Sequence, residues 1–534
     1  MNRKSLVLPA IVGLLTPVLA ACGGSGSGGE SGDAIVVGTT DRFIADSDAP
    51  APLDPAFAYD NGPWNILHQV VQTLMIQPRG GGDPVPEAAE SCGFSDKGNE
   101  RYACKLRKGL KFANGDAVTA ADVKFSIDRV RTIKSDSGVD GLLSTVDTVE
   151  TQGDDEVIFH LKTADATFPF KLSTPVAAIL NPKDYEKNKL RKGFQIDGSG
   201  PYTMQAEVKN NELVKATFTK NPHYKGQLTL KNDKAVLQSF GDADAMGDAL
   251  DKGDIDVMSR TMTPDQISEL QNDTTGQINL VEMPGLETRY LAFKTDAPTV
   301  KSKAVRQAMA RVIDRDELVS KVYGTQAQSL YSLVPATITG HSNSFFNKYG
   351  TPSVDEARTL LGKAGITAPV KLTLHYTTDH YGAGTAKEFE VLKKQLNDSG
   401  LFDVSIEGTR WDKYRPAQLK GNYDVYGMGW FPDFPDADNF LTPFLDKDNF
   451  LNLPYANSEI RNTLIPQSQR EADRLTASKS LTDIQDIVAE DVPVIPLWQG
   501  KQYIAVRDDI TGSEYAMSAT SDLQLWELSR GVSG

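Results

Sequence analysis

Short apolar runs and helical spacings of apolar residues follow one another along the chain, with no repeat period. Alternating apolar and polar positions predict a strand over 102–107, and apolar residues three and four apart predict a helix over 65–75. Another helix is expected after Thr119, where Asp122 completes a capping box, and a further one after the capping residue Ser302. Because strands, helices and hairpins are mixed, the sequence predicts an α/β fold with mixed sheets in at least two lobes.

The stretch 427–441 shows neither the alternating spacing of a strand nor the spacing of a helix. It follows the apolar and aromatic run 423–426, which predicts a strand. Glycines and prolines crowd its first half, which is typical of a shaped loop. One acid, Asp433, stands close to Trp430 and Phe431. An acid among aromatic residues is costly to bury unless it meets a cation, so the stretch is either a loop whose aromatic residues cap a core or a ligand-binding loop.

Composition and charge narrow the classes of function. The chain has 534 residues, of which 40% are hydrophobic and 24% charged, a globular balance with room for two or three domains. The net charge of −15 at pH 7 argues against a nucleic-acid partner and supplies no basic patch for anionic membranes.

The N-terminus has the pattern of an export signal. Its apolar core, 6–19, is short and interrupted by prolines, and no other stretch is apolar enough to cross a membrane. It ends in Leu19-Ala20-Ala21-Cys22, which resembles a bacterial lipobox; the alternative is an ordinary cleavage site beside a chance cysteine. The resemblance implies a lipoprotein signal peptide at 1–21, a lipid on Cys22 and a flexible Gly/Ser tether at 22–33. We therefore expect a chain anchored to the extracytoplasmic face of a bacterial cell membrane.

Two further cysteines, Cys92 and Cys104, remain in the chain. In an oxidising compartment we expect them to pair and close a short loop. The alternative is two free buried thiols. Their spacing is typical of neither a zinc site nor a redox motif.

No catalytic or cofactor signature stands in the sequence. It lacks a nucleophile elbow, a zinc-protease helix motif and a phosphate-binding loop. His375 and His380 fall on a strand and a turn, so we expect no metal site, and the run 436–439 lacks the glycine and distal Glu of a calcium loop, so we expect it to be a solvated loop. With no enzyme activity and no cofactor expected, an exported and tethered bilobal chain suggests ligand capture between lobes.

Several ordered motifs carry a family resemblance. The runs 105–112, 114–116 and 119–126 together resemble the signature of the family 5 extracellular solute-binding proteins, which are peptide and nickel receptors of ABC importers. Further matching motifs stand at Gly198–Tyr202, Asn221–Tyr224, Gly253–Val257, Val305–Met309, Ile313–Arg315 and Asp355–Arg358.

The resemblance implies a bilobal periplasmic-binding-protein-like fold with a two-segment hinge and a ligand buried between the lobes. Lobe I is expected to hold 34–285 plus 495–534, with an extra subdomain at 53–198, and lobe II to hold 286–494. The implied partners are a peptide or other small solute and the membrane permease of an ABC importer. We expect a monomer.

The stretch 427–441 then gains a role. In peptide receptors of this family, an Asp after Gly-Trp-x-x pairs with the α-ammonium of the peptide, and that pattern stands here from Gly429 to Asp433. The resemblance implies that Asp433 supplies the charge, that Trp430 and the upstream Trp411 form pocket walls, and that Gly429 allows backbone pairing with an extended peptide.

One position departs from the family pattern. Some oligopeptide receptors carry an Arg two residues before that glycine, where this chain has Gly427, so the sequence shows no cation for a C-terminal carboxylate. Other ligands stay open: a nickel chelate, an oligosaccharide or a siderophore could stack on Trp411 and Trp430. Two alternatives belong to other classes of function: a ligand sensor that takes no part in transport, and an extracellular enzyme.

Overall fold

The computed structural model describes residues 34–79, 81–382, 384–447, 449 and 451–531. The expected signal peptide, the tether and the lipid-carrying Cys22 lie outside these residues. Within the described part of the chain, no helix has the length and apolar character needed to span a bilayer.

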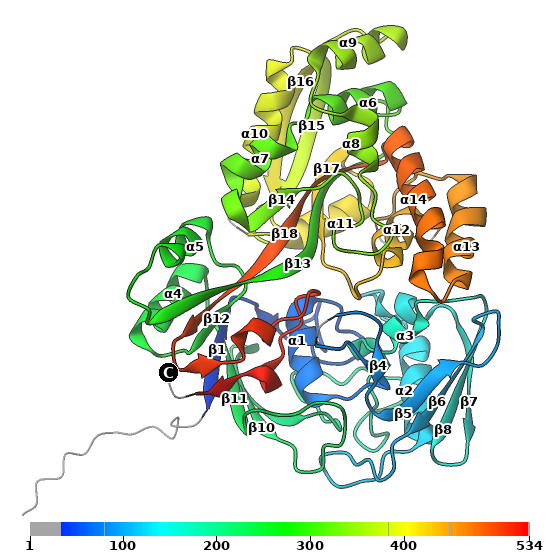
Figure 1. The fold of residues 1–534 in the computed structure, drawn as a ribbon, viewed down its shortest axis with the longest axis vertical. Coiled ribbons are helices and arrows are strands. Elements are labelled where there is room, and N and C mark those ends of the chain that lie inside the picture. Colours follow the sequence, from blue (N-terminus) through cyan, green and yellow to red (C-terminus); the bar gives the residue numbers. More distant parts are fainter. Residues whose placement is uncertain (1–33, 80, 383, 448, 450, 532–534) are drawn as a thin grey trace, which may run out of the picture. The chain divides into compact units, whose positions relative to one another are not determined.

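One large mixed sheet runs through the described residues (Figure 1). Its main strand order is β16-β15-β17-β13-β18-β12-β1-β11-β10-β2, with β14 paired to β18 and β9 paired to β10. Parallel pairs (β1 with β11, β15 with β16) and antiparallel pairs (β13 with β17 and β18) both occur, which confirms the predicted mixed sheets. The strands are β1 (Ile35–Thr39), β2 (Phe43–Ile44), β9 (Tyr202–Lys209), β10 (Glu212–Lys220), β11 (Lys234–Ser239), β12 (Val257–Ser259), β13 (Ile278–Phe293), β14 (Ala327–Ser329), β15 (Val370–Thr377), β16 (Phe402–Thr409), β17 (Val425–Trp430) and β18 (Val494–Arg507).

Two hydrophobic cores are joined by the long strands β13 and β18, which lie side by side in Figure 1. On β13, Met283 belongs to the first core and Leu291 to the second; on β18, Leu497 belongs to the second core and Ile504 to the first. The two strands therefore form two chain connections between the cores, as a two-segment hinge requires. The lobe boundaries given above and the subdomain at 53–198 stay predictions.

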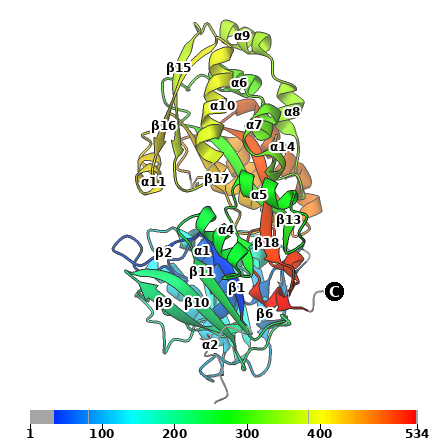
Figure 2. The same ribbon diagram turned by 90° about the vertical axis from the view of Figure 1, so that its left-hand side faces the viewer.

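Helices cover both parts of the large sheet. Helix α10 packs along β15 and β16 and contributes to the second core (Figure 2), and α4 and α5 enclose a third, small apolar cluster near β12. The helices are α1 (Asn61–Val70), α2 (Ala120–Ile133), α3 (Phe168–Lys171), α4 (Ala243–Lys252), α5 (Pro264–Gln271), α6 (Lys303–Val312), α7 (Arg315–Val322), α8 (Ser344–Tyr349), α9 (Val354–Lys363), α10 (Gly384–Asp398), α11 (Trp411–Leu419), α12 (Asp438–Leu445), α13 (Ile465–Arg470) and α14 (Arg474–Asp491).

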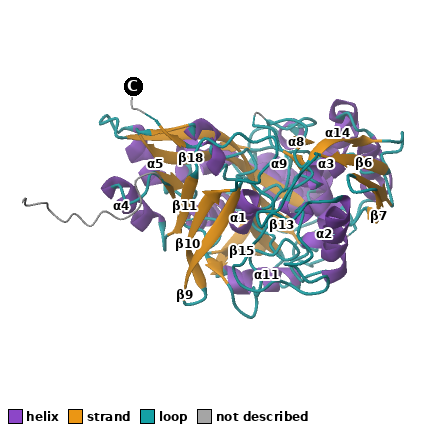
Figure 3. Cartoon of the chain, turned by 90° about the horizontal axis from the view of Figure 1, so that it is seen from below, coloured by secondary structure: helices purple, strands orange, loops and turns teal. Residues whose placement is uncertain are grey.

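A separate sheet with strand order β5-β6-β8-β7 packs against α2, and Figure 3 shows β6 and β7 standing apart from β9–β11. Cys92 and Cys104 lie directly opposite each other on β5 and β6 and form a disulfide, so the predicted pairing is confirmed and the alternative of free thiols is wrong. The remaining strands are β3 (Met75–Ile76), β4 (Val85–Pro86), β5 (Ala89–Phe94), β6 (Arg101–Leu106), β7 (Val146–Gln152), β8 (Glu156–Leu161), β19 (Ile510–Thr511) and β20 (Ser529–Arg530).

Local capping signals placed the starts of two helices correctly. Helix α2 begins after Thr119 with the expected capping box to Asp122, and α6 begins after Ser302. The helix expected over 65–75 is instead α1, which ends at Val70. The carbonyl of Val70 also accepts the N–H of Gly200, and the chain beyond it pairs with 87–89, so tertiary partners end the helix before its apolar spacing does.

The prediction of a loop over all of 427–441 is wrong. Residues 427–430 continue strand β17 and are buried, and α12 begins at Asp438, which leaves only 431–437 as a loop. The expectation of a solvated run at 436–439 is also wrong. Asp436 is 5% exposed and makes a bidentate ion pair with Arg474, with N–O distances of 2.7 and 2.9 Å.

Candidate functional site

The four residues predicted to bind ligand line one cavity of about 350 Å³: Gly429 and Trp430 on β17, Asp433 on the loop after it, and Trp411 at the start of α11. The opposite side comes from the segment around α1, including Tyr59 and Trp64. The cavity is thus lined from both parts of the chain that β13 and β18 connect.

The carboxyl group of Asp433 has only neutral partners. Its Oδ2 accepts hydrogen bonds from Tyr59 Oη at 3.2 Å and from Asn439 Nδ2 at 3.0 Å, and its backbone N–H donates to Asn439 Oδ1 at 2.8 Å. Within the described part of the chain, no cation lies within ion-pair distance of this carboxyl group.

The surroundings of Asp433 also shift the pKa of its carboxyl group. Burial raises the pKa of its carboxyl group to about 6, although the hydrogen bonds from Asn439 and Tyr59 favour the charged form. An ionised carboxylate in such a place is costly unless a cation reaches it. The site therefore suits a positively charged ligand group.

The backbone of Gly429 faces the cavity rather than the neighbouring strand. In an antiparallel ladder, pairs that exchange main-chain hydrogen bonds alternate with pairs that do not. Lys294 N–H donates to the carbonyl of Asp424, so that pair is hydrogen-bonded, and counting along β13 and β17 makes Arg289 and Gly429 a pair without mutual hydrogen bonds. The carbonyl of Gly429 accepts from Tyr381 Oη at 3.4 Å.

No further strand of the described residues covers this edge of β17. Strand β15 pairs only with Val425 and Tyr426, short of the segment that faces the cavity. An extended ligand backbone can therefore pair with the edge at Gly429, as strand addition requires.

The two tryptophans form walls in different ways. Trp430 is 6% exposed, packs edge to face on Phe444 with ring centroids 5.4 Å apart, and donates from Nε1 to Asn439 Oδ1 at 3.3 Å. Trp411 is stacked on His380 with centroids 3.8 Å apart and an interplanar angle of 3°. A flat ligand stacking on that face of Trp411 would have to displace His380.

Several lining residues were missed by sequence reasoning, among them Tyr59, His380 and Tyr381. They come from distant segments with no motif of their own. Burial, followed by the charges of Arg289 and Arg260, lowers the pKa of His380 to about 3, so its imidazole is neutral at pH 7. Asn439, which orients Asp433, stood in the sequence within the run dismissed as solvated, and its position six residues after the acid was the one available signal.

The described residues contain no group of three or more His, Cys, Asp or Glu side chains that could hold a metal ion. His375 stacks on Tyr423, whereas His380 stacks on Trp411. The two histidines thus have separate surroundings.

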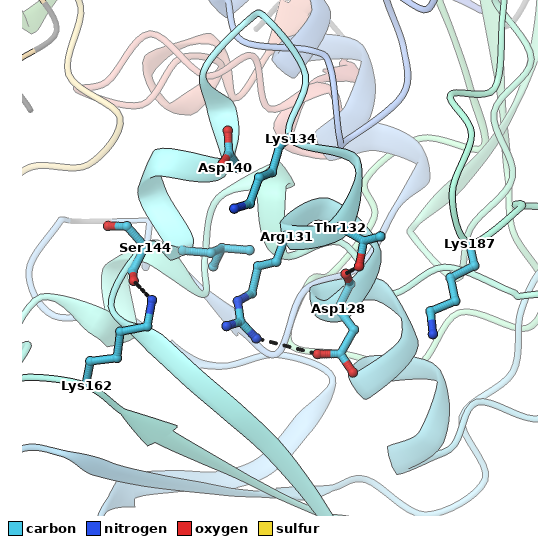
Figure 4. A pocket seen from close by; sticks show the side chains of 9 residues that line it. Asp128, Arg131, Thr132, Lys134, Asp140, Ser144, Lys162 and Lys187 are labelled. Atoms are coloured by element: carbon cyan, nitrogen blue, oxygen red, sulfur yellow. Dashed lines mark hydrogen bonds and ion pairs between the residues drawn. The ribbon is translucent and has the colours of Figure 1, made fainter.

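A cavity of about 520 Å³ beside α2 contains none of the predicted site residues (Figure 4). Two of its basic groups are engaged within the protein: Arg131 donates to the carbonyl of Val146 at 2.8 Å and pairs with Asp128 at 3.6 Å, and Lys162 donates to the carbonyl of Ser144 at 2.9 Å. Size alone therefore does not identify the site.

Comparison with known proteins gives consistent matches. The model of the bacterial extracellular solute-binding proteins, family 5 middle, matches residues 83–452. A probable D,D-dipeptide-binding periplasmic protein (DdpA) of Escherichia coli is 26% identical over 485 residues, covering 87% of this chain and 89% of that protein. An oligopeptide-binding protein (OppA) of Bacillus subtilis is 25% identical over 528 residues, covering 93% and 94%.

Solved structures support the fold. The periplasmic binding protein DppA from Helicobacter pylori, solved with the peptide STSA, superposes with a TM-score of 0.77 at 21% identity, covering 93% of this chain and 98% of that one. At this identity the likeness concerns the fold, which is the bilobal one of periplasmic binding proteins.

Proposed function

The chain belongs to the bacterial extracellular solute-binding proteins of family 5, and on that premise we propose that it captures di- and oligopeptides between its lobes and delivers them to the permease of an ABC importer. The family is one of solute-binding proteins, so the chain is a binding protein rather than an enzyme. Both similar proteins described above carry names that assign them peptides.

The single observation that carries this proposal is the partly buried acid of the cavity, which has no ion-pair partner among the described residues. Asp433 is held by Tyr59 and Asn439 but meets no cation of the described residues. The α-ammonium of a peptide supplies that missing charge, and the open edge of β17 at Gly429 offers main-chain pairing to the rest of the ligand. Recognition through the terminus and main chain tolerates many side chains.

The proposal extends to attachment and architecture. A diacylglyceryl group on Cys22 would hold the chain at the membrane beside its permease, with 22–33 as a tether. Lobe I would comprise 34–285 and 495–534, lobe II would comprise 286–494, and the protein would act as a monomer. Mass spectrometry of membrane-extracted protein tests the lipid, because a mature chain without two acyl chains on Cys22 contradicts it.

Calorimetry with matched peptides tests the proposed pairing of Asp433 with the peptide α-ammonium. We expect Asp433→Asn to weaken peptide binding by about 2–5 kcal/mol, because it removes one partner of a buried charge pair. N-acetylation of the peptide should weaken binding to the native protein by a similar amount and add little to the loss in the variant. If N-acetylated peptides bind the native protein as tightly as free peptides do, Asp433 does not pair with the peptide ammonium.

Asp60 provides a matched control, because it is another acid that lines the same cavity. Asp60→Asn should leave peptide affinity nearly unchanged. If Asp60→Asn abolishes binding and Asp433→Asn does not, the ammonium site lies at Asp60. Native mass spectrometry of the purified chain identifies other outcomes, since a released metal chelate, glycan or siderophore would contradict a peptide ligand.

A further inference from the structure

A second cavity, of about 190 Å³, adjoins the one that contains Asp433. His380, Tyr381 and Phe431 line both cavities. Arg289 of β13 lines the second cavity together with Glu287, Tyr323 and Trp498. The ligand space therefore has an acid in one compartment and a buried guanidinium in the next.

We propose that Arg289 binds the C-terminal carboxylate of the peptide whose ammonium binds Asp433, which makes the ligands short peptides with a free C-terminus. This inference rests on the proposed function for the ammonium end. Gly427 stands where some oligopeptide receptors carry an Arg, and in this chain Arg289 on β13 would supply the cation for the carboxylate instead.

The hydrogen bonding of Arg289 is incomplete. The residue is 4% exposed, and its Nη2 lies 2.6 Å from Glu287 Oε1 and 3.3 Å from the carbonyl of Tyr381. Its Nε and Nη1 are buried and have no hydrogen-bond partner. Buried guanidinium donors without acceptors are costly. Each of the two shares an edge of the guanidinium with Nη2, so a carboxylate that takes the place of Glu287 at Nη2 can bind such an edge with two oxygens.

Aromatic rings hold the guanidinium in place. Its carbon lies 4.0 Å from the ring centroid of Tyr381 and 5.0 Å from that of Trp498. The ring of Trp498 is fixed in turn by a hydrogen bond from Nε1 to Glu388 Oε2 at 3.1 Å. Arg289 is thus oriented by the protein while some of its donors stay unused.

The glycines of β17 explain why the cation stands on β13. Gly429 lies opposite Arg289 in the ladder, and a Cβ at Gly429 would overlap Arg289 Nη1. A Cβ at Gly427 would overlap the ring of Phe389. A side chain at Gly427 therefore has no room, whereas Gly429 leaves the space that the guanidinium of Arg289 occupies.

The chain between the two charges limits ligand length. Gly429, over which the guanidinium lies, and Asp433 are four residues apart, so their Cα atoms are at most about 14 Å apart. An extended peptide adds about 3.5 Å per residue. The two charged side chains and their hydrogen bonds add several ångströms to this distance, so a ligand spanning from Asp433 to Arg289 is a short peptide of a few residues.

Glu287 is the existing counter-ion, and its side chain is 24% exposed. It can turn toward water when a ligand carboxylate arrives, so it competes with the ligand. We expect Glu287→Gln to increase the preference for free-acid peptides severalfold.

The test uses tripeptides of randomised sequence, made with a free or an amidated C-terminus and competed on the whole mature protein by native mass spectrometry. We expect the native protein to prefer the free acids at least tenfold. Arg289→Gln should bind both sets about equally, with unchanged affinity for the amides. Equal binding of acids and amides by the native protein, or an unchanged preference in Arg289→Gln, would overturn the inference.

Arg415 is the matched control, because it is an arginine of the cavity that contains Asp433. Arg415→Gln should keep the preference for free acids; loss of the preference there and not in Arg289→Gln would move the carboxylate site to Arg415. If Arg289→Gln does not fold, Arg289→Lys retains the charge without the planar fork and should show a reduced preference. An unchanged preference in Arg289→Lys would likewise count against the inference.

The two proposals fail in different ways. Peptides that bind through Asp433 but show no preference for a free C-terminus would refute the role of Arg289 alone. An absence of any peptide binding would refute the proposed function and, with it, this inference.

Discussion

The loop 431–437 carries two acids, the buried Asp436 and the partly buried Asp433, and the two differ in their partners. Asp436 accepts from Nε and Nη2 of Arg474, at 2.7 and 2.9 Å, whereas Asp433 meets only the neutral groups of Tyr59 and Asn439. A buried charge that is fully paired serves the fold, and one that the protein leaves unpaired is available to a ligand.

Two buried arginines show the same contrast. Arg129 pairs with both oxygens of Asp54, at 2.7 and 2.6 Å, and also donates to the carbonyls of Glu186 and Lys189. Arg289 keeps Nε and Nη1 without partners and lines a cavity. Satisfaction of hydrogen bonds, rather than burial or charge alone, separates structural groups from candidate ligand groups.

Breaking the structural pair should have the largest effect. Asp436→Ala leaves the guanidinium of Arg474 buried without its carboxylate, so we expect the free energy of unfolding to fall by about 3–5 kcal/mol. Urea denaturation measures this. A loss below about 1 kcal/mol, within the range of a surface ion pair, would show that the contrast with Asp433 is false.

Removing the unpaired charge should have the opposite effect on the ligand-free protein. A carboxyl pKa of about 6 against an ordinary 3.8 means that the folded state binds more protons between these values, so native stability falls as pH rises through that window. In Asp433→Asn the free energy of unfolding has no such fall with pH. We expect this variant to be about 1–3 kcal/mol more stable than the native protein at pH 7 and nearly equal to it below pH 4. Urea midpoints at both pH values measure it; destabilisation at pH 7 would contradict the prediction.

Filling the space at Gly429 should disturb the other unpaired charge. In Gly429→Ala the new methyl group overlaps the guanidinium of Arg289, and we expect a loss of about 1–3 kcal/mol in stability together with a lower preference for free-acid peptides. Gly362→Ala on α9 is the control, because no atom lies near its Cβ position. Equal behaviour of the two variants would show that Arg289 does not occupy the space over Gly429.

Lowering the pH should weaken ligand binding gradually. Peptide amines stay protonated between pH 5 and 7, whereas Asp433 gains a proton below about pH 6, so affinity should fall up to about tenfold per pH unit below that value. Calorimetry at pH 7, 6 and 5 measures the slope. Asp433→Asn should show no such slope, and a native affinity that is constant over this range would argue against an ammonium at Asp433.

Local interactions made much of the fold predictable. The capping box of Thr119 and Asp122 and the cap at Ser302 depend on groups within a few residues, and α2 and α6 begin where they indicate. The pairing of Cys92 and Cys104 also joins neighbouring strands. Where long-range contacts compete, prediction failed: α1 ends at Val70 because Gly200 bonds to its carbonyl.

By itself, the sequence determined the mixed α/β fold, the family motifs and the position of Asp433 within Gly-Trp-x-x-Asp, because each is written in residues close together in the chain. Only the tertiary structure decided that 427–430 is a buried strand, that Asp436 is paired, and that Arg289 lies over Gly429. The physical reason is that burial and charge pairing depend on partners far away in sequence: Tyr59 is separated from Asp433 by 374 positions. No local pattern records which buried charges the folded chain leaves for a ligand.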